Sequence, residues 1–245
     1  MEKVKYVYAI TDDREEHHFG RIGIDEAPVY TLIQGALAAV VSDMQMGKVR
    51  PERKRLSAHH RVVSRLMSAH AVLPAVFGTI APRHSIIAML KKNQGAFLRQ
   101  LKHVDGRVEM GLNVSWSAPN IFEYFVARHP ELSAFRDEIF SGKESRAKKI
   151  ELGKFFEDIL NRDRQKHAEA IRKALSRLCI EIRQNKPRNE KEIVRLACLI
   201  GKEDVGQFEA AVSNVAGLFD DGYTFDYSGP WCPYNFVGEL KPEEE

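Results

Sequence analysis

Residues 228–237 read Ser-Gly-Pro-Trp-Cys-Pro-Tyr-Asn-Phe-Val. Two prolines and a glycine here lie among a tryptophan, a tyrosine and a phenylalanine. Gly229-Pro230 and Cys232-Pro233 stop a helix and cannot both donate hydrogen bonds to a central strand. The aromatic side chains favour burial and are atypical of a disordered, proline-rich tail. We therefore predict a rigid, extended edge that closes a domain.

A strand is predicted immediately before this stretch. It is the last of several helices and strands predicted for the second half of the chain. Alternation of apolar and polar residues indicates strands, and recurrence every three or four residues indicates helices. A two-residue turn between the two long helices predicts a helical hairpin. The predicted elements are a strand over 108–116, helices over 118–140 and 143–183, a strand over 193–200, a helix over 205–216 and a strand over 223–227.

The first half of the chain is likewise predicted to contain both strands and helices. Gln34-Gly35-Ala36 separates two β-branched runs and suits a short hairpin connection. We expect a small antiparallel sheet with helices on one face. The predicted elements are a strand over 3–10, hairpin strands over 28–33 and 37–41, a helix over 51–70, a strand over 72–80 and a helix over 85–102.

Asp105-Gly106 is a turn signal between these halves and marks a domain boundary. The predicted fold class is α+β, with two ferredoxin-like α/β sandwich domains in tandem. The first domain spans residues 1–105. The second spans residues 106–245 and contains the long helical hairpin and the closing aromatic and proline tail.

The overall composition describes a soluble globular protein. The chain has 245 residues, 29% of them charged and 44% hydrophobic, with a formal net charge of +3. No apolar run approaches the ~18–20 residues of a membrane span. Three widely spaced cysteines fit no disulfide framework. We expect a cytoplasmic protein that does not bind membranes.

The charge is unevenly distributed, with a basic helix near the N-terminus and an acidic segment near the C-terminus. Residues 48–65 carry seven Lys or Arg against one acid, and residues 203–226 carry six acids and no Lys or Arg. Such a basic face attracts acidic surfaces or phosphates, or is a solvated helix surface. The candidate partner-contact residues are Arg53, Lys54, Arg55, Arg61 and Arg65.

No arrangement of residues indicates catalysis, a metal site or a cofactor. His17-His18 and His59-His60 lack the Cys or acidic partners that a zinc site needs. No phosphate-binding glycine loop and no nucleophile elbow is present. His60 and His70 lie on the predicted apolar stripe of the helix, and His59 at its border is a candidate buried anchor. The sequence therefore predicts a protein without enzyme activity.

Nucleic acid is a disfavoured partner. A ferredoxin-like sheet binds RNA when aromatic residues on its central strands stack on bases, but the strand signature of such modules is missing. Tyr6, Tyr8, Tyr30 and Phe77 are better explained as core and sheet aromatics. The cysteines are explained as small core residues, except Cys232, which could be exposed.

At three places the chain resembles the gas vesicle protein L/F family. Residues 6–10, Tyr-Val-Tyr-Ala-Ile, resemble its opening strand. Residues 58–63, Ala-His-His-Arg-Val-Val, resemble its His-Glu-x-Val-Leu motif. Residues 72–79, Val-Leu-Pro-Ala-Val-Phe-Gly-Thr, resemble the Leu-Pro-x-Arg-Phe-Gly-Thr motif that follows it. Residues 229–236 resemble its Gly-Pro-Trp-Pro-Pro-Tyr-Ser-Phe terminus. The candidate structural anchors are His59, Pro74, Phe77, Gly78, Trp231, Pro233, Tyr234 and Phe236.

Three positions depart from the family pattern. His60 replaces a frequent Glu, Val76 a frequent Arg, and Cys232 the first of two prolines. The first two remove charge, or reverse its tendency, beside the junction between the helix and the strand. The third keeps the spacing of the aromatic residues.

The resemblance implies a non-enzymatic accessory protein of gas vesicle formation, associated with gas vesicles in the cytoplasm. It implies partners that include the small hydrophobic shell protein and other accessory proteins. Such a partner needs an apolar groove with a charged rim, which we expect on the helical hairpin, with the basic face as a second contact. The alternatives are an RNA-binding module and a ligand-sensing regulator of the ferredoxin-like class.

Overall fold

The structure is a computed structural model that describes residues 3–45, 47–141 and 146–242. The chain divides into two compact units. The first contains residues 1–109 together with 230–245, and the second contains residues 110–229. This division differs from the predicted one, because the C-terminal tail belongs to the first unit and not to the second.

The first unit is built on an antiparallel sheet in the order β2-β3-β4-β1-β5, with β6 also paired to β1. The hairpin predicted around Gly35 is present: β3 and β4 pair from Gln34↔Leu37 onward, and Gly35 adopts a positive φ of 62° in the turn. The strands are β1 (Lys3–Thr11), β2 (His18–Gly20), β3 (Val29–Gln34), β4 (Leu37–Gln45), β5 (Leu73–Pro74) and β6 (Ile80–Ala81).

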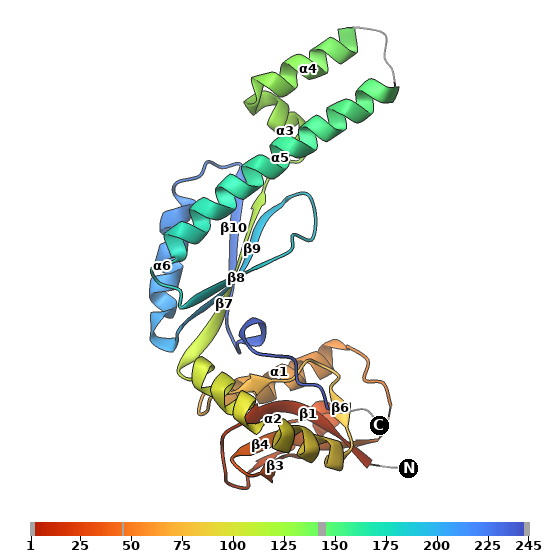
Figure 1. Cartoon of the computed structure of the whole chain (residues 1–245), viewed down its shortest axis with the longest axis vertical. Coiled ribbons are helices and arrows are strands. Elements are labelled where there is room, and N and C mark those ends of the chain that lie inside the picture. Colours follow the sequence, from red (N-terminus) through yellow and green to blue (C-terminus); the bar gives the residue numbers. More distant parts are fainter. Residues whose placement is uncertain (1–2, 46, 142–145, 243–245) are drawn as a thin grey trace. The chain divides into compact units, whose positions relative to one another are not determined.

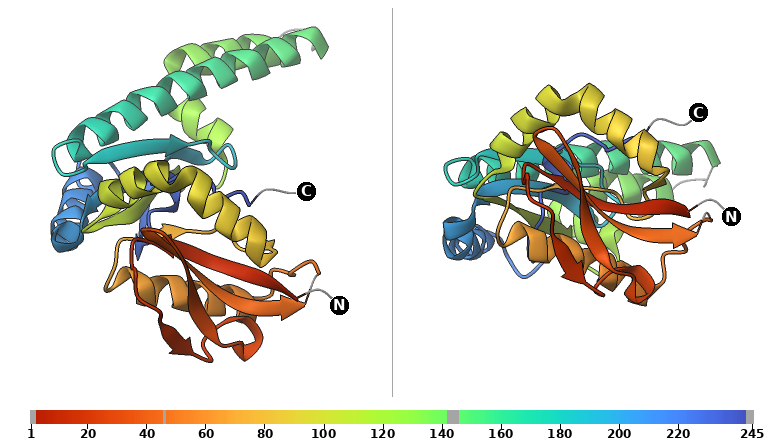
Figure 2. Two further views of the ribbon diagram at one scale, coloured as in Figure 1. Left: turned by 60° about the horizontal axis from the view of Figure 1, so that its bottom comes forward. Right: turned by 90° about the horizontal axis from the view of Figure 1, so that it is seen from below.

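Two helices, α1 (Arg53–Met67) and α2 (Arg83–Val104), cover opposite faces of this sheet, as Figure 2 shows. Tyr6 and Tyr8 of β1 share a core cluster with α1, whereas Val7 shares a cluster with α2. Alternate residues of a strand point to opposite faces, so a strand buried on both sides reads as continuously apolar. The prediction of helices on one face was therefore wrong.

The apolar stripe of α1 is also offset from the predicted one. Leu56 is 43% exposed and His60 is exposed. The buried positions recur at three- and four-residue intervals on a neighbouring face. They are Ala58, His59, Val62, Val63 and Leu66.

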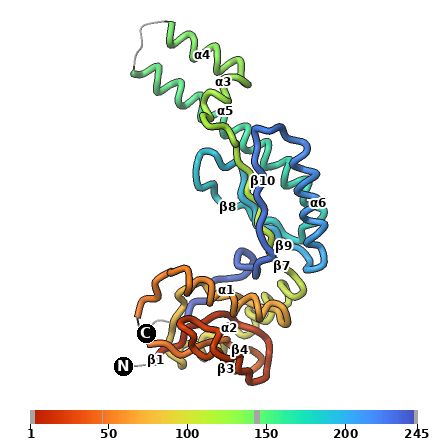
Figure 3. Tube along the Cα trace, turned by 180° about the vertical axis from the view of Figure 1, so that it is seen from behind, coloured from red at the N-terminus to blue at the C-terminus, as the bar shows by residue number. Residues whose placement is uncertain are grey.

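The second unit contains a four-stranded sheet in the order β10-β7-β9-β8. Figures 1 and 3 show α5 and α6 side by side along one face of this sheet. The unit follows the order β-α-β-β-α-β, with three successive helices in the first connection. The elements are β7 (Arg107–Trp116), α3 (Ile121–Arg128), α4 (Pro130–Ser141), α5 (Arg146–Leu175), β8 (Glu181–Asn185), β9 (Glu192–Gly201), α6 (Val205–Ala216) and β10 (Tyr223–Trp231).

Two of the predicted helices in this unit were too long. The first is divided at Pro130, because proline lacks the backbone N–H and restricts the residue before it. The second ends at Leu175, and β8 follows where a helix was predicted. The predicted turn at Ser141-Gly142 extends outside the described residues. Short 3-10 turns occur at Ile24–Glu26 (η1), Lys202–Asp204 (η2) and Tyr234–Phe236 (η3).

Among the helices of the described residues, none has both the length and the apolar content needed to cross a membrane. The fold is thus a mixed α+β fold of two compact units. The predicted candidate residues all lie in the first unit.

Candidate functional site

His59 is the centre of the predicted site in the first unit. It lies on the inner face of α1 and is 4% exposed. Its Nδ1 lies 2.8 Å from the hydroxyl of Tyr6 on β1, and its Nε2 lies 3.2 Å from the hydroxyl of Tyr234 in the tail. One imidazole therefore connects a helix, a strand and the C-terminal tail.

Burial keeps this imidazole uncharged. Desolvation lowers the pKa of His59 to about 4, while the backbone of Ala75 opposes the shift. Burial also raises the pKa of both Tyr6 and Tyr234 above the ordinary tyrosine value. The three side chains form a neutral hydrogen-bonded group at neutral pH.

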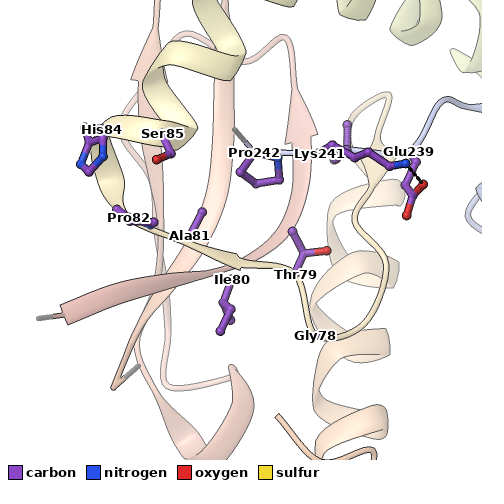
Figure 4. A pocket seen from close by; sticks show the side chains of 11 residues that line it. Gly78, Thr79, Ile80, Ala81, Pro82, His84, Ser85, Glu239, Lys241 and Pro242 are labelled. Atoms are coloured by element: carbon purple, nitrogen blue, oxygen red, sulfur yellow. Dashed lines mark ion pairs between the residues drawn. The ribbon is translucent and has the colours of Figure 1, made fainter. Parts of the chain in front are cut away.

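The segment between α1 and α2 completes this group; instead of the single strand predicted over 72–80, it forms the short strands β5 and β6 with a turn at Phe77-Gly78 between them (Figure 4 shows Gly78 to Pro82). Gly78 has a φ of 92° and its N–H donates to the Tyr6 hydroxyl at 3.0 Å. Phe77 contacts the His59 ring edge-on, with ring centroids 5.8 Å apart. Pro74 is buried in β5 and pairs with Ala9. The structure thus brings together His59 and the predicted anchors of this segment.

The tail is fixed to the first unit by buried side chains and by hydrogen bonds. Cys232 and Phe236 are buried, so the suggestion that Cys232 could be exposed was wrong. The Cys232 thiol donates to the Val72 carbonyl at 3.8 Å. Asn235 donates its backbone N–H and its amide to the Glu109 carboxylate at 2.8 and 2.6 Å. Pro233 starts the η3 turn between these contacts.

Trp231 differs from the other tail residues because its side chain is 39% exposed. It lies edge-on against the exposed ring of His60, with centroids 5.2 Å apart. The interpretation of Trp231 as a buried anchor therefore does not hold. The residue is a surface aromatic beside the basic helix.

The five predicted contact cations are not equivalent. Arg55 makes a bidentate bond with Asp25 of η1, at 3.2 and 3.0 Å, which raises the pKa of Arg55. Lys54 lies 3.8 Å from Glu26. Arg53 and Arg61 are exposed and have no acidic partner within the described residues. These two are the cations most available to a partner.

Arg65 is exposed as well, and it donates to the Phe19 carbonyl at 3.5 Å. The helix itself carries no acidic residue in its sequence from Arg53 to Met67. Beside the ion pairs of Lys54 and Arg55, its outer face carries the exposed cations Arg53, Arg61 and Arg65. An acidic or phosphate-bearing surface is complementary to it.

A second candidate surface lies on the helical hairpin of the second unit. A groove of about 440 Å³ lies between α4 and α5. Its floor is the edge-on pair Phe135 and Phe155, with ring centroids 5.6 Å apart. Individual groove residues could not be named from the sequence, because the register of the two helices decides which side chains meet. The groove is lined by Glu131, Phe135, Glu151, Lys154, Phe155 and Asp158.

The histidine pairs do not form metal sites in the described part of the chain. His17 pairs with Asp13 at 2.7 Å, and His59 is buried whereas the neighbouring His60 is exposed on α1. Nowhere in residues 3–45, 47–141 and 146–242 do three or more His, Cys, Asp or Glu side chains gather as metal ligands.

These features define a mixed α+β protein of two units whose candidate sites are exposed contact surfaces. The sequence model of the gas vesicle synthesis protein GvpL/GvpF family matches residues 4–238. The chain belongs to this family.

Named relatives include both types of family member. Gas vesicle protein F of Streptomyces sp. (strain CB03234) is 28% identical over 239 residues, covering 95% of this chain and 98% of the relative. Gas vesicle protein L of the same strain is 26% identical, covering 97% and 94%. Gas vesicle protein F2 of Halobacterium salinarum is 24% identical, covering 95% and 91%.

Two crystal structures share the fold. Gas vesicle protein GvpF from Anabaena sp. PCC7120 has a TM-score of 0.84 at 22% identity, covering 96% of this chain and 98% of that chain. GvpF from Microcystis aeruginosa has a TM-score of 0.81 at 21% identity, covering 95% and 98%. The whole chain, with both units, therefore has the α+β fold of these proteins.

Proposed function

We propose that this protein is a non-enzymatic accessory protein of gas vesicle assembly. It binds the small hydrophobic shell protein and other accessory proteins, in the cytoplasm and in association with the vesicle. Family membership over nearly the whole chain supports a role in gas vesicles. The observation that carries the proposed binding role is the groove between α4 and α5.

This groove has the features expected for holding a small apolar subunit. The Phe135–Phe155 pair offers an aromatic floor to an aliphatic side chain. Glu151 and Asp158 on the rim have no ion-pair partner within the described residues. An apolar floor with a charged rim gives affinity through burial and orientation through charge.

A co-purification assay with the major shell protein tests the groove. The double variant Phe135→Ser and Phe155→Ser should reduce the shell protein retained by about tenfold, because each aromatic anchor contributes about 1 kcal/mol or more to an interface. Phe140→Ser is the matched control, since Phe140 lies on the same helix outside the groove and is 58% exposed. Equal retention by the wild type and the folded double variant would exclude the groove as the contact.

The basic face of α1 is the proposed second contact, with Arg53, Lys54, Arg55, Arg61 and Arg65 as its candidate residues. Reversing Arg53, Lys54 and Arg55 together would also remove the Arg55–Asp25 pair inside the first unit. Arg53→Glu combined with Arg61→Glu avoids this damage, because both residues lack internal acidic partners among the described residues. This double variant should weaken shell-protein binding mainly at low salt.

We also propose that the second unit is a ferredoxin-like variant with a helical hairpin inserted in its first connection. Its β-α-β-β-α-β order supports this. The first unit has a different order, with four strands before its first helix, so the tandem arrangement is not retained.

RNA binding and ligand sensing are the competing functions. An RNA platform needs exposed aromatic residues on central strands, but Tyr6 and Tyr8 are buried beneath α1. Trp231 beside the basic helix is the one observation that favours nucleic acid. A gel shift at physiological salt that is lost in Trp231→Ala would favour that function over the proposed one.

A further inference from the structure

Two of the three cysteines of the chain lie next to each other in the second unit. Cys179 follows the end of α5, where its N–H donates to the Leu175 carbonyl at 3.1 Å, and Cys198 lies in β9. Their thiols are hydrogen-bonded to each other, and neither forms a disulfide in the structure. This pair plays no part in the proposed binding of the shell protein.

The pairing of β8 with β9 explains why the two cysteines meet. The strands are antiparallel, and Glu181 lies opposite Leu199. Ile180 N–H also donates to the Leu199 carbonyl, at 2.8 Å, so two successive residues oppose one residue of β9. Such a bulge changes the direction of the side chains beside it. Because Cys198 precedes Leu199 in the same strand, this bulge fixes the backbone of Cys179 close to Cys198.

The two sulfur atoms differ in their access to solvent. The Cys198 side chain is 0% exposed, whereas Cys179 is partly exposed. A reagent in solution therefore reaches the sulfur of Cys179 first. Cys198 can react with a group on the Cys179 sulfur, because the two thiols are in contact.

The same contact activates Cys179 as a nucleophile. The hydrogen bond from the Cys198 thiol lowers the pKa of Cys179, because it stabilises the thiolate, while partial burial opposes this shift. The thiolate is the form of cysteine that attacks disulfides. A partly exposed cysteine of lowered pKa beside a second thiol is typical of redox-sensing cysteine pairs.

We propose that Cys179 and Cys198 form a reversible redox pair whose oxidant is a low-molecular-weight disulfide of the glutathione type. The Cys179 thiolate attacks one sulfur of this disulfide, RSSR, forms a mixed disulfide with it and releases the other half as RS⁻. The Cys198 thiolate then attacks the Cys179 sulfur and releases the second RS⁻. Each RS⁻ takes up a proton that a cysteine has lost. Two protein thiols and RSSR thus give one protein disulfide and two RSH, with transfer of two electrons to RSSR.

This chemistry makes the pair a sensor and not a permanent crosslink. In the cytoplasm, the proposed location of the protein, disulfides form transiently because the glutathione pool is reducing. The pair is therefore reduced in the resting cell and closes when that pool is oxidised. Since Cys179 follows directly on α5, the bond attaches the end of this helix to β9.

The test is equilibration of the folded full chain in buffers with increasing ratios of oxidised to reduced glutathione. Acid quenching, alkylation of the remaining thiols and mass spectrometry of the digested chain then give the state of each cysteine. A fragment in which Cys179 is bonded to Cys198 is expected, and it should disappear when reduced glutathione is restored. Cys232 is the internal reference and should stay reduced, because it is buried in the first unit against the Val72 carbonyl.

Two variants test the order of the two attacks. In Cys198→Ala, Cys179 has no neighbouring thiol to displace glutathione, so the mixed disulfide at Cys179 should accumulate. In Cys179→Ala, the buried Cys198 should stay reduced over the same range of buffers. Cys232→Ala is the matched control and should form the bond between Cys179 and Cys198 as the wild type does. Circular dichroism establishes that each variant is folded.

The proposal has clear contrary outcomes. Reduced Cys179 and Cys198 in the wild type at every buffer ratio would overturn it. Equal amounts of the glutathione adduct at Cys179 in the wild type and in Cys198→Ala would also overturn it, because Cys198 would then not displace glutathione. A bond that formed only in urea would belong to the unfolded chain, with the same consequence.

Discussion

His59 is folded into the first unit in its neutral form, and this makes the stability of the unit depend on pH. The pKa of His59 is lowered from 6.5 to about 4 by burial. Between these values the unfolded chain takes up a proton that the folded chain does not. The free energy of unfolding therefore falls as the pH falls through this window. Below the folded pKa, the entire stabilisation that neutral His59 contributes to the first unit is lost.

The expected loss from His59 between pH 7 and pH 5 is about 2 kcal/mol. Urea unfolding at several pH values measures it, as the difference between the wild type and His59→Gln. The glutamine variant should be less stable at pH 7 and should lack this part of the pH dependence. His60→Gln, at the exposed neighbouring position, should keep it. Parallel curves for the wild type and His59→Gln would contradict a buried neutral imidazole.

The tail aromatics offer a second prediction at this scale. Phe236→Ala removes a buried ring and should cost about 3–5 kcal/mol. Trp231→Ala removes a ring that is 39% exposed and contacts His60, so it should cost about 1–2 kcal/mol. Thermal or chemical unfolding of the two variants side by side gives the comparison. A larger cost for Trp231→Ala would restore the interpretation of Trp231 as the main anchor of the tail.

The sequence indicated some of these residues better than others. His59 stood at the border of a predicted stripe, and the true stripe is offset toward it. Apolar residues occur both on the face of this helix that contains Leu56 and on the face that contains Ala58. The sequence alone therefore did not determine which of these faces is buried. The exposure of Trp231 depends on how the tail meets α1, which no local pattern contains.

At the scale of elements, the η1 turn is fitted closely around the Tyr8 hydroxyl. Ile24 N–H donates to this hydroxyl at 2.9 Å. A Cβ atom added at Gly23 would lie 2.5 Å from it and 2.8 Å from the Ala27 carbonyl. Gly23 has an ordinary φ of −77°, so space and not backbone conformation requires glycine there.

Gly23→Ala should therefore destabilise the protein by about 1–3 kcal/mol through overpacking. Gly153→Ala is the matched change on the exposed side of α5, where a Cβ meets nothing within 4 Å. It should stabilise by about 0.5–1 kcal/mol, because alanine favours the helix. Opposite shifts of the unfolding midpoint are expected. Two shifts of the same sign would contradict the close fit around Tyr8.

Elements with strong local patterns were predicted well, and elements that depend on distant partners were not. The alternation in 108–116 matches β7, and the run in 193–200 lies within β9. β8 was missed because Leu178, Cys179 and Ile182 continue the helical spacing of α5. Its strand conformation comes from pairing with β9, for example Ile182↔Cys198, and this pairing has no local signal.

At the scale of the whole molecule, the second unit is an insertion within the first. The chain leaves the first unit after Glu109 and returns at Pro230. The returning residues complete the first core, where Leu240 packs with α2 and Cys232 packs with α1. The sequence indicated that residues 228–237 close a domain. It could not indicate which one, because either core can accept buried aromatic residues.

A minimal first unit should need both of its segments. Residues 1–109 alone lack the buried side chains of Cys232, Phe236 and Leu240. They also leave the Glu109 carboxylate without Asn235. The loss of about 5 kcal/mol or more is comparable to the stability of a small domain. This fragment should therefore be largely unfolded, as judged by circular dichroism and amide dispersion.

The matched chain joins residues 1–109 to residues 230–245 through a short glycine and serine linker. Such a linker can span the gap, because β7 and β10 are neighbours in their sheet and a Cβ on Gly111 would lie 2.9 Å from the Ser228 hydroxyl. This chain should unfold cooperatively, and Phe236→Ala should destabilise it as it destabilises the full chain. If the linked chain were no more stable than residues 1–109, the tail would not complete the first core. That result would contradict the conclusion that residues 1–109 and 230–245 together form the first unit.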